Sequence, residues 1–187
     1  MRITILFLVA AAAAFPQKLS FGLKAGHPLE DVFKSGVTLG TIVSPSSGRY
    51  TIGPMLELHL PHRTSVELDV LYRPANSGLH LTSGFSKLTA SEWRIPLLLK
   101  YRFRPGLVTP FVGAGPAWQA FTGVTSGSGS TTPGVAAAAG LEGKFAILRL
   151  SGELRYSRWG SATFDSLVSG LARLNRNQVE VLVGISF

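Results

Sequence analysis

Apolar and polar residues alternate along eight segments of the chain. In the clearest segment, residues 92–103, an apolar side chain stands at every second position, and Glu, Arg and Lys stand between them. A period of two is the pattern of a β-strand with one apolar and one polar face. The other segments are residues 18–26, 50–60, 65–73, 108–121, 134–144, 148–157 and 178–187. The pattern therefore predicts an all-β chain of eight strands.

The connections between these segments alternate between long and short. Long loops are expected at residues 27–49, 74–90, 123–133 and 160–175, and tight turns at 61–63, 104–107 and 145–146. Outer-membrane barrels sort their connections in this way, with short turns at the periplasmic end and long loops outside. The sequence predicts an eight-stranded antiparallel up-and-down transmembrane β-barrel over residues 18–187, with both ends on the short-turn side.

Aromatic residues gather near both ends of the predicted strands. Amphipathic rings favour the two membrane–water interfaces, so this placement predicts two aromatic belts. The belt at the long-loop end would comprise Tyr50, Tyr72, Trp93, Trp118 and Tyr156, and the belt at the short-turn end Tyr101, Phe103, Phe111 and Phe187.

The first residues of the chain have the composition of an export signal. A basic start, Met1-Arg2, precedes an apolar stretch over residues 3–14 that ends in three alanines. This stretch is shorter than the roughly 20 apolar residues that a membrane-spanning helix needs. We interpret residues 1–14 as a signal peptide, with cleavage as late as residue 17. The chain has no cysteine, so neither disulfides nor thiol chemistry is expected.

Alternation alone does not decide which face of the strands points inward. A soluble lipocalin-like barrel would enclose the aliphatic face, whereas a membrane barrel turns it outward. The charged face carries comparable numbers of acids and bases, and charges enclosed in a narrow eight-stranded barrel must be paired. We therefore expect the charged face inside, where an ion-pair network would plug the lumen. Its predicted members are Glu57, Glu67, Asp69, Arg94, Lys100, Arg102, Glu142, Arg149, Glu153, Arg155 and Glu180, and Lys24, Arg73, Glu92 and Lys144 share their face.

A few residues do not fit the simple pattern. Leu71, Leu98 and Leu182 have the parity of the inward face, where they would help to fill the lumen. A proline removes one hydrogen-bond donor from a sheet, so bulges are expected at the prolines within strands. These prolines are Pro54, Pro96, Pro110 and Pro116.

Three short motifs resemble the small outer-membrane barrels of the OmpA-like and opacity-protein-like families. The fifth strand of those barrels is similar to residues 109–118, Thr-Pro-Phe-Val-Gly-Ala-Gly-Pro-Ala-Trp. Their seventh strand is similar to Glu153-Leu-Arg-Tyr156, and their ending to residues 181–187. The resemblance implies a protein of the Gram-negative outer membrane, exported through the inner membrane. It also implies that Phe187 is part of the signal read by the barrel-assembly machinery.

The resemblance does not imply one function, because members of these families are anchors, adhesins or binders of host factors. We expect a monomer with a structural, adhesive or surface-binding role, without enzymatic activity, cofactor, metal or nucleic-acid partner. The net charge of +8 favours anionic partners. In addition to membrane lipid, lipopolysaccharide is a candidate partner, and its predicted contacts are Arg158, Arg173 and Arg176.

Two alternative functions remain open from the sequence. Some related barrels modify lipid A, and a deacylase or acyltransferase could draw on His27 and His80 with nearby Asp31, Ser83 and Ser86. Composition alone does not establish such a set, because a catalytic triad is recognised by its geometry. The second alternative is a soluble periplasmic lipocalin-like barrel that binds an apolar ligand.

Overall fold

The computed structural model describes most of the chain after residue 18. The described residues are 19–29, 33–34, 36–38, 41–47, 50–81, 84–103, 106–122, 131–160, 173–174 and 176–187. Within them, side chains are described at 19–29, 50–74, 91–103, 106–122, 131–160 and 176–187. The predicted signal peptide, residues 1–14, lies outside this part of the chain.

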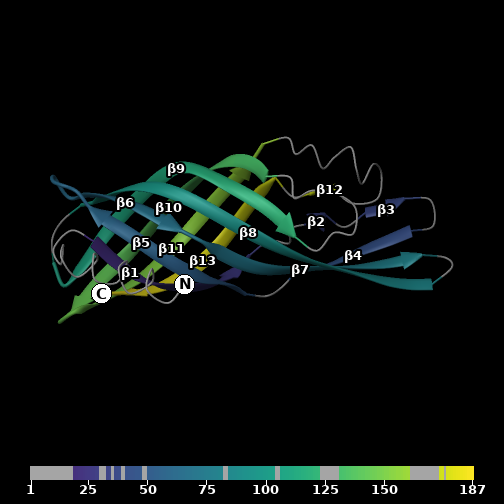
Figure 1. The fold of residues 1–187 in the computed structure, drawn as a ribbon, viewed down its shortest axis with the longest axis horizontal. Helices are drawn as coiled ribbons and strands as arrows, with labels where there is room; N and C mark the ends of the chain where they lie inside the picture. The colour runs from purple at the N-terminus through teal and green to yellow at the C-terminus, as the bar shows by residue number, and fades with distance from the viewer. Residues whose placement is uncertain are drawn as a thin grey trace, which may run out of the picture.

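The described strands form a closed eight-stranded antiparallel barrel, as the alternation predicted (Figure 1). Strands β6 and β7 count as one barrel strand, because only Val70 separates them. Strand β1 pairs with β13 on one side and with β5 on the other, which closes the sheet on itself. The barrel strands are β1 (Leu19–Pro28), β5 (Thr51–His59), β6 (Thr64–Asp69) with β7 (Leu71–Leu81), β8 (Gly84–Arg102), β9 (Val108–Thr122), β10 (Thr131–Phe145), β11 (Leu148–Trp159) and β13 (Asn177–Ser186).

The region predicted as a long loop at residues 74–90 is instead a β-hairpin, so that prediction is wrong. Strands β7 and β8 remain paired from Ala75 opposite Ala90 to Leu81 opposite Gly84. Strand β4 (Thr41–Ser47) pairs with the outer edge of β7, and β3 (Gly36–Thr38) pairs with β4. This small sheet extends beyond the other barrel strands (Figure 1). Residues 27–49, also predicted as a loop, therefore contain strands as well, including β2 (Phe33–Lys34), which pairs with β12 (Arg173–Leu174).

Two of the short connections at the other end are tight turns, in agreement with the sequence, and the third, predicted at 104–107, lies partly outside the described residues. His62 and Arg63 adopt φ values of 63° and 65° between β5 and β6. Ala146 adopts a φ of 53° in the two-residue turn between β10 and β11. Three left-handed residues at one end of the barrel allow its strands to reverse within two or three residues.

The four strand prolines do not produce bulges, so that prediction is wrong. The pairing between neighbouring strands keeps one register past Pro54, Pro96, Pro110 and Pro116. A proline lacks an N–H but keeps its carbonyl as an acceptor. The Val70 amide donates to the Pro54 carbonyl at 3.0 Å, and the Phe103 amide donates to the Pro110 carbonyl at 3.0 Å. The ladder loses single donors without inserting a residue.

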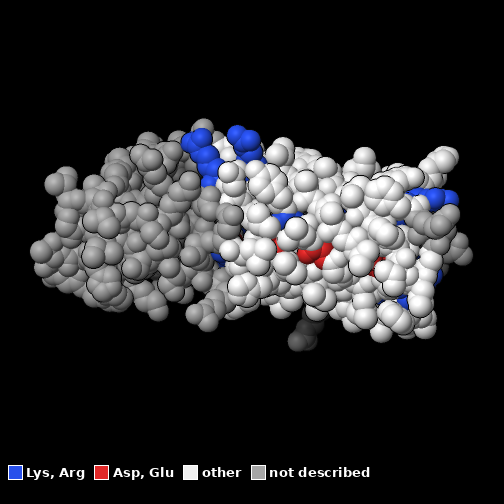
Figure 2. Space-filling view, turned by 180° about the vertical axis from the view of Figure 1, so that it is seen from behind, with Lys and Arg blue, Asp and Glu red and all other residues white. Residues whose placement is uncertain are grey.

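The barrel has its polar residues inside and its aliphatic residues outside. Glu67 and Asp69 are fully buried, whereas Leu99 and Val183 are 58% and 61% exposed. Leu71, Leu98 and Leu182 are buried inside, as their parity predicted. Figure 2 shows that the described barrel surface is mostly free of charged residues, with lysine and arginine gathered toward its two ends. A wide aliphatic surface of this kind is costly in water and is the surface that membrane barrels turn to lipid.

The aromatic belts are present, with one correction. At the long-loop end, Tyr72 packs edge-on against Trp93 with ring centroids 5.2 Å apart. At the short-turn end, Tyr101 packs against Phe103 at 5.4 Å. Phe111 was predicted to belong to this second belt, but it is 1% exposed and lies inside. Its parity is opposite to that of the outward Trp118, and no bulge restores it.

Candidate functional site

The candidate functional site is the charged interior of the barrel. Every second residue of a barrel strand points inward, so an unbroken register places all the charged positions of one parity in the lumen. The structure places the predicted lumenal set there, together with Lys24, Arg73 and Glu92 from the same face. Lys144 shares the parity but is exposed at the rim. These side chains divide into three tiers along the barrel.

The long-loop tier consists of Arg73, Glu92, Arg94 and Glu180. An Arg94 guanidinium nitrogen lies 2.7 Å from a Glu180 carboxylate oxygen, and another lies 3.6 Å from Glu92. Arg73 approaches Glu92 at 4.0 Å. Two neutral residues complete the tier: Arg94 donates to the Thr51 hydroxyl at 2.9 Å, and the Gln119 amide donates to Glu92 at 2.6 Å.

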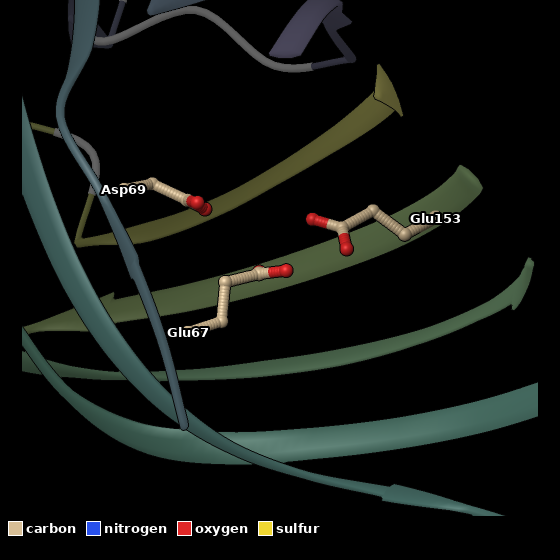
Figure 3. Close-up of side chains that lie close together, drawn as sticks. All are labelled: Glu67, Asp69 and Glu153. Carbon is tan, nitrogen blue, oxygen red and sulfur yellow. The ribbon is translucent and has the colours of Figure 1, made fainter. Parts of the chain in front are cut away.

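The middle tier consists of Lys24, Lys100 and Arg155 with Glu67, Asp69 and Glu153. The three carboxylates point toward one another, Glu67 and Asp69 from β6 and Glu153 from β11 (Figure 3). The Lys24 ammonium lies among them, 2.5 Å from Glu67, 3.2 Å from Glu153 and 3.4 Å from Asp69. The Arg155 guanidinium also contacts all three, at 2.7 Å from Asp69 and 3.4 Å from Glu67, with a short bond to Glu153. Lys100 binds the other carboxylate oxygen of Glu67 at 2.8 Å.

The short-turn tier consists of Arg102 and Arg149 with Glu57 and Glu142. Arg102 bridges the two acids, at 2.6 Å from Glu57 and 2.9 Å from Glu142. Arg149 approaches Glu142 at 3.8 Å. The Ser65 hydroxyl donates to Glu57 at 2.5 Å. Lys100 of the middle tier reaches Glu57 at 3.6 Å and connects the two tiers.

Among the described residues, each tier contains as many acids as bases. Removing a charge from water costs several kcal/mol, which the interior recovers only when each ion is paired and hydrogen-bonded. Because the acids and bases balance within every tier, each charge can be paired locally. No tier then has a net charge that would set up an electric field along the barrel. Alternation revealed which residues face inward, but it could not assign partners, because most of these pairs cross between strands that are not neighbours in sequence.

The cluster of Glu67, Asp69 and Glu153 also has the composition of a cation site. Their carboxylate oxygens lie within 4.8 Å of one another. The ammonium of Lys24 and the guanidinium of Arg155 already lie among these oxygens, at the place where a metal ion would bind. The cluster is therefore neutralised by the chain itself, and we assign no metal to it.

The remaining predicted site residues lie toward the ends of the barrel. Phe187 exchanges two backbone hydrogen bonds with Phe21, at 3.1 and 3.2 Å, and the two rings pack edge-on at 4.7 Å. Arg158 and Arg176 are exposed near the long-loop end, where the Trp159 amide donates to the Arg176 carbonyl. Arg173 lies in β12, opposite Lys34.

Little of the catalytic set considered from the sequence falls within the described side chains. His27 is exposed near the end of β1, opposite Val181 of β13. Only the backbone is described at His80 of β7 and at Ser86 of β8, and Asp31 and Ser83 lie outside the described residues. The assembly of these residues into a site stays a prediction that the structure does not test.

Comparisons with known proteins identify the fold. No protein-family model matches the chain, and no curated protein matches it. Among solved structures, OprG, an outer membrane protein from Pseudomonas aeruginosa, matches with a TM-score of 0.62 at 14% identity over 90% of this chain and 92% of that chain. Neisserial surface protein A matches with a TM-score of 0.59 at 13% identity over 90% of this chain and 95% of that chain. A major outer membrane protein from Thermus thermophilus matches with a TM-score of 0.53 at 13% identity, over 90% of this chain and 98% of that chain.

The chain therefore has the fold of the small eight-stranded outer-membrane barrels, as its motifs indicated. Within the described residues no helix is long and apolar enough to cross a membrane. The lipocalin-like alternative is wrong, because such a barrel encloses an apolar cavity, whereas this one encloses buried ion pairs and turns its aliphatic side chains outward.

Proposed function

We propose that the chain is a monomeric protein of the bacterial outer membrane, where it has a structural or surface-binding role rather than that of a wide pore or an enzyme. The observation that carries this proposal is the set of three neutral tiers inside an aliphatic wall. An outward aliphatic surface requires hydrocarbon around it, and closed eight-stranded barrels satisfy all their backbone groups in hydrocarbon.

The proposal includes a lumen closed to solutes. An eight-stranded barrel is just wide enough for side chains to fill its interior. The largest fully buried side chains are Arg73, Arg94, Arg155, Lys24 and Lys100, all of them members of the tiers. A solute passing through would have to separate buried ion pairs, and leaving one such charge unpaired costs about 3–5 kcal/mol.

Surface binding would fall to the long-loop end. There the sheet of β3, β4, β7 and β8 extends beyond the rest of the barrel (Figure 1). Arg158 and Arg176 are exposed near the same end, and Arg173 lies between them in sequence. Guanidinium groups bind phosphate in a bidentate manner, so lipopolysaccharide, whose inner region is phosphorylated, is the partner that we propose for these arginines.

Reconstitution into planar lipid bilayers tests the closed lumen. The folded protein should leave the membrane as resistive as a protein-free control, and steady open channels would contradict the proposal.

Cell fractionation should place the protein with the outer membrane, and folded and boiled samples should migrate differently on a detergent gel. Incubation with lipid A should leave its acyl chains intact, whereas release of fatty acid would favour the enzymatic alternative.

The lipopolysaccharide contact has its own test. The double variant Arg158→Gln/Arg176→Gln should retain less lipopolysaccharide through purification than the parent protein. Arg158→Lys/Arg176→Lys keeps both positive charges and is the control, since it should retain more lipopolysaccharide than the glutamine variant. Equal retention by all three proteins would contradict the assigned contact.

A further inference from the structure

The short-turn end of the barrel contains a polar pocket that the ion-pair tiers do not fill. Its volume is about 280 Å³. It opens beside the turns at residues 61–63 and 145–147, at the end opposite to the extended sheet. The charged and titratable residues that line it are His59, Arg63, Arg102, Glu142, Lys144 and Arg149.

The pocket carries more positive than negative charge. Arg102 and Arg149 are matched by Glu57 and Glu142 within the short-turn tier. Arg63 and Lys144 are additional: both are exposed, and neither forms an ion pair with a described residue. The Arg63 guanidinium donates to the Phe103 carbonyl at 2.7 Å, which anchors it at the rim and leaves its other N–H groups available.

Arg149 is held in place by a neutral partner. Its guanidinium lies 2.7 Å from Nε2 of His59, and the Ser20 hydroxyl lies 3.0 Å from the same nitrogen. An arginine has donors only, so His59 accepts this bond and must be neutral there. The nearest carboxylate, on Glu142, is 3.8 Å away, and the Arg149 side chain is 24% exposed. Arg149 is thus oriented by His59 and is reachable from solvent, and its contact with Glu142 is longer than that of Arg102.

We propose that this short-turn mouth binds a phosphate group, with Arg149, Lys144 and Arg63 as its ligands. Three cations from the β5–β6 turn, β10 and β11 line one pocket. Glu142 is the one acid among the described lining residues, and Arg102 engages it at 2.9 Å whereas Arg149 approaches it only at 3.8 Å. A guanidinium fork matches two phosphate oxygens, and a lysine adds a point charge. The phosphate could come from free inorganic phosphate or from the headgroup of a phospholipid at this face of the membrane. Both sources present the same phosphate group to the pocket, and separate titrations with each of them distinguish the two.

The test uses the folded full-length protein in octyl glucoside, a detergent without phosphate. Backbone amide resonances of Gly106 and Thr109, which line the pocket, are followed by NMR while inorganic phosphate replaces chloride at constant ionic strength. A parallel titration uses dihexanoyl-phosphatidylglycerol below its micelle concentration. Saturable shifts with inorganic phosphate identify free phosphate as sufficient, and shifts with the lipid alone identify a headgroup site.

Variants decide whether the pocket is responsible. Lys144→Gln and Arg63→Gln should each weaken binding about two- to fivefold, the range expected for exposed ion pairs. Lys144 makes no ion pair with a described residue, so its variant should fold even if the turn at Arg63 does not tolerate replacement. Arg158→Gln removes a charge at the opposite end and should leave the response of Gly106 and Thr109 unchanged. The proposal is overturned if neither probe shifts these amides, or if Lys144→Gln binds as tightly as the parent.

Discussion

The ammonium nitrogen of Lys24 lies 2.5 Å from a carboxylate oxygen of Glu67, and neither side chain is exposed to solvent. The two residues belong to β1 and β6, which do not pair with each other, since β5 lies between them. The contact therefore passes over β5 on the lumenal side and links two strands that are not paired with each other. Because Glu67 also binds Lys100 and Arg155, this one carboxylate holds three cations of the middle tier.

Replacing Lys24 should be strongly destabilising. Lys24→Met leaves three carboxylates in the middle tier with only Lys100 and Arg155 to neutralise them. Removing one member of a buried ion pair costs about 3–5 kcal/mol. Urea unfolding of the protein in lipid vesicles measures this loss. The control Lys144→Met removes an exposed lysine outside the tiers and should change the free energy of unfolding by less than about 0.5 kcal/mol.

The charge balance of the middle tier, rather than Lys24 itself, should stabilise the barrel. The double variant Lys24→Met/Asp69→Asn returns the middle tier to equal numbers of acids and bases. We expect the double variant to be more stable than the sum of the two single losses predicts, with a coupling of about 1–3 kcal/mol. A double-mutant cycle in the same vesicles gives this value. Additive losses, within about 0.5 kcal/mol, would refute local charge balance as the organising feature.

A charged residue on the outer face should destabilise the barrel strongly at the middle of a strand and only weakly near the end of a strand. Leu154 is 51% exposed near the middle of β11, and Ile147 is 81% exposed in the turn that precedes this strand. In a bilayer, Leu154→Arg should cost about 2–4 kcal/mol and Ile147→Arg about 0–1 kcal/mol. Vesicle unfolding compares the two variants. Equal, small losses are what a water-exposed surface would give.

Close strand packing makes one inward glycine irreplaceable. A Cβ at Gly53 would clash with the Val70 carbonyl oxygen of the facing strand, whereas a Cβ at Gly152 has no atom within 4 Å. Gly53→Ala must therefore shift the backbone where β6 meets β7, and we expect a large drop in the yield of folded barrel. Gly152→Ala should fold like the parent protein. The fraction of heat-modifiable protein on a detergent gel measures both, and equal yields would contradict the packing.

The fold could be predicted from the sequence where lipid enforces an apolar face. Residues 92–103 alternate because one side of β8 meets the outside and the other meets the lumen, and the prediction holds there within a residue. Residues 74–90 do not alternate, yet they are paired as a hairpin. The strand prediction depended on that alternation, so the pattern could not reveal this pairing.

The candidate site was predictable as a set but not as contacts. Parity places Glu67, Arg155 and their companions inside, because it needs only the direction of each side chain. Which base contacts which acid depends on barrel closure and on the stagger between strands. Neither can be derived from the alternation of apolar and polar residues along a strand. The contact of His59 with Arg149 joins residues 90 positions apart and could not be read from alternation. Phe111 was misassigned because its position near a strand end outweighed its parity.

The central claim is that hydrocarbon surrounds the aliphatic face while the ion pairs lie within. The chain has no cysteine, so single cysteines along β11 can carry nitroxide spin labels. Labels at the outward positions 152, 154 and 156 should collide with lipid-soluble oxygen and be protected from an aqueous nickel chelate. Labels at the inward positions 151 and 157 should be shielded from oxygen. The predicted result is that accessibility to oxygen alternates between successive positions of β11, high at the outward labels and low at the inward ones. Outward labels that collide freely with the nickel chelate in vesicles would contradict the account.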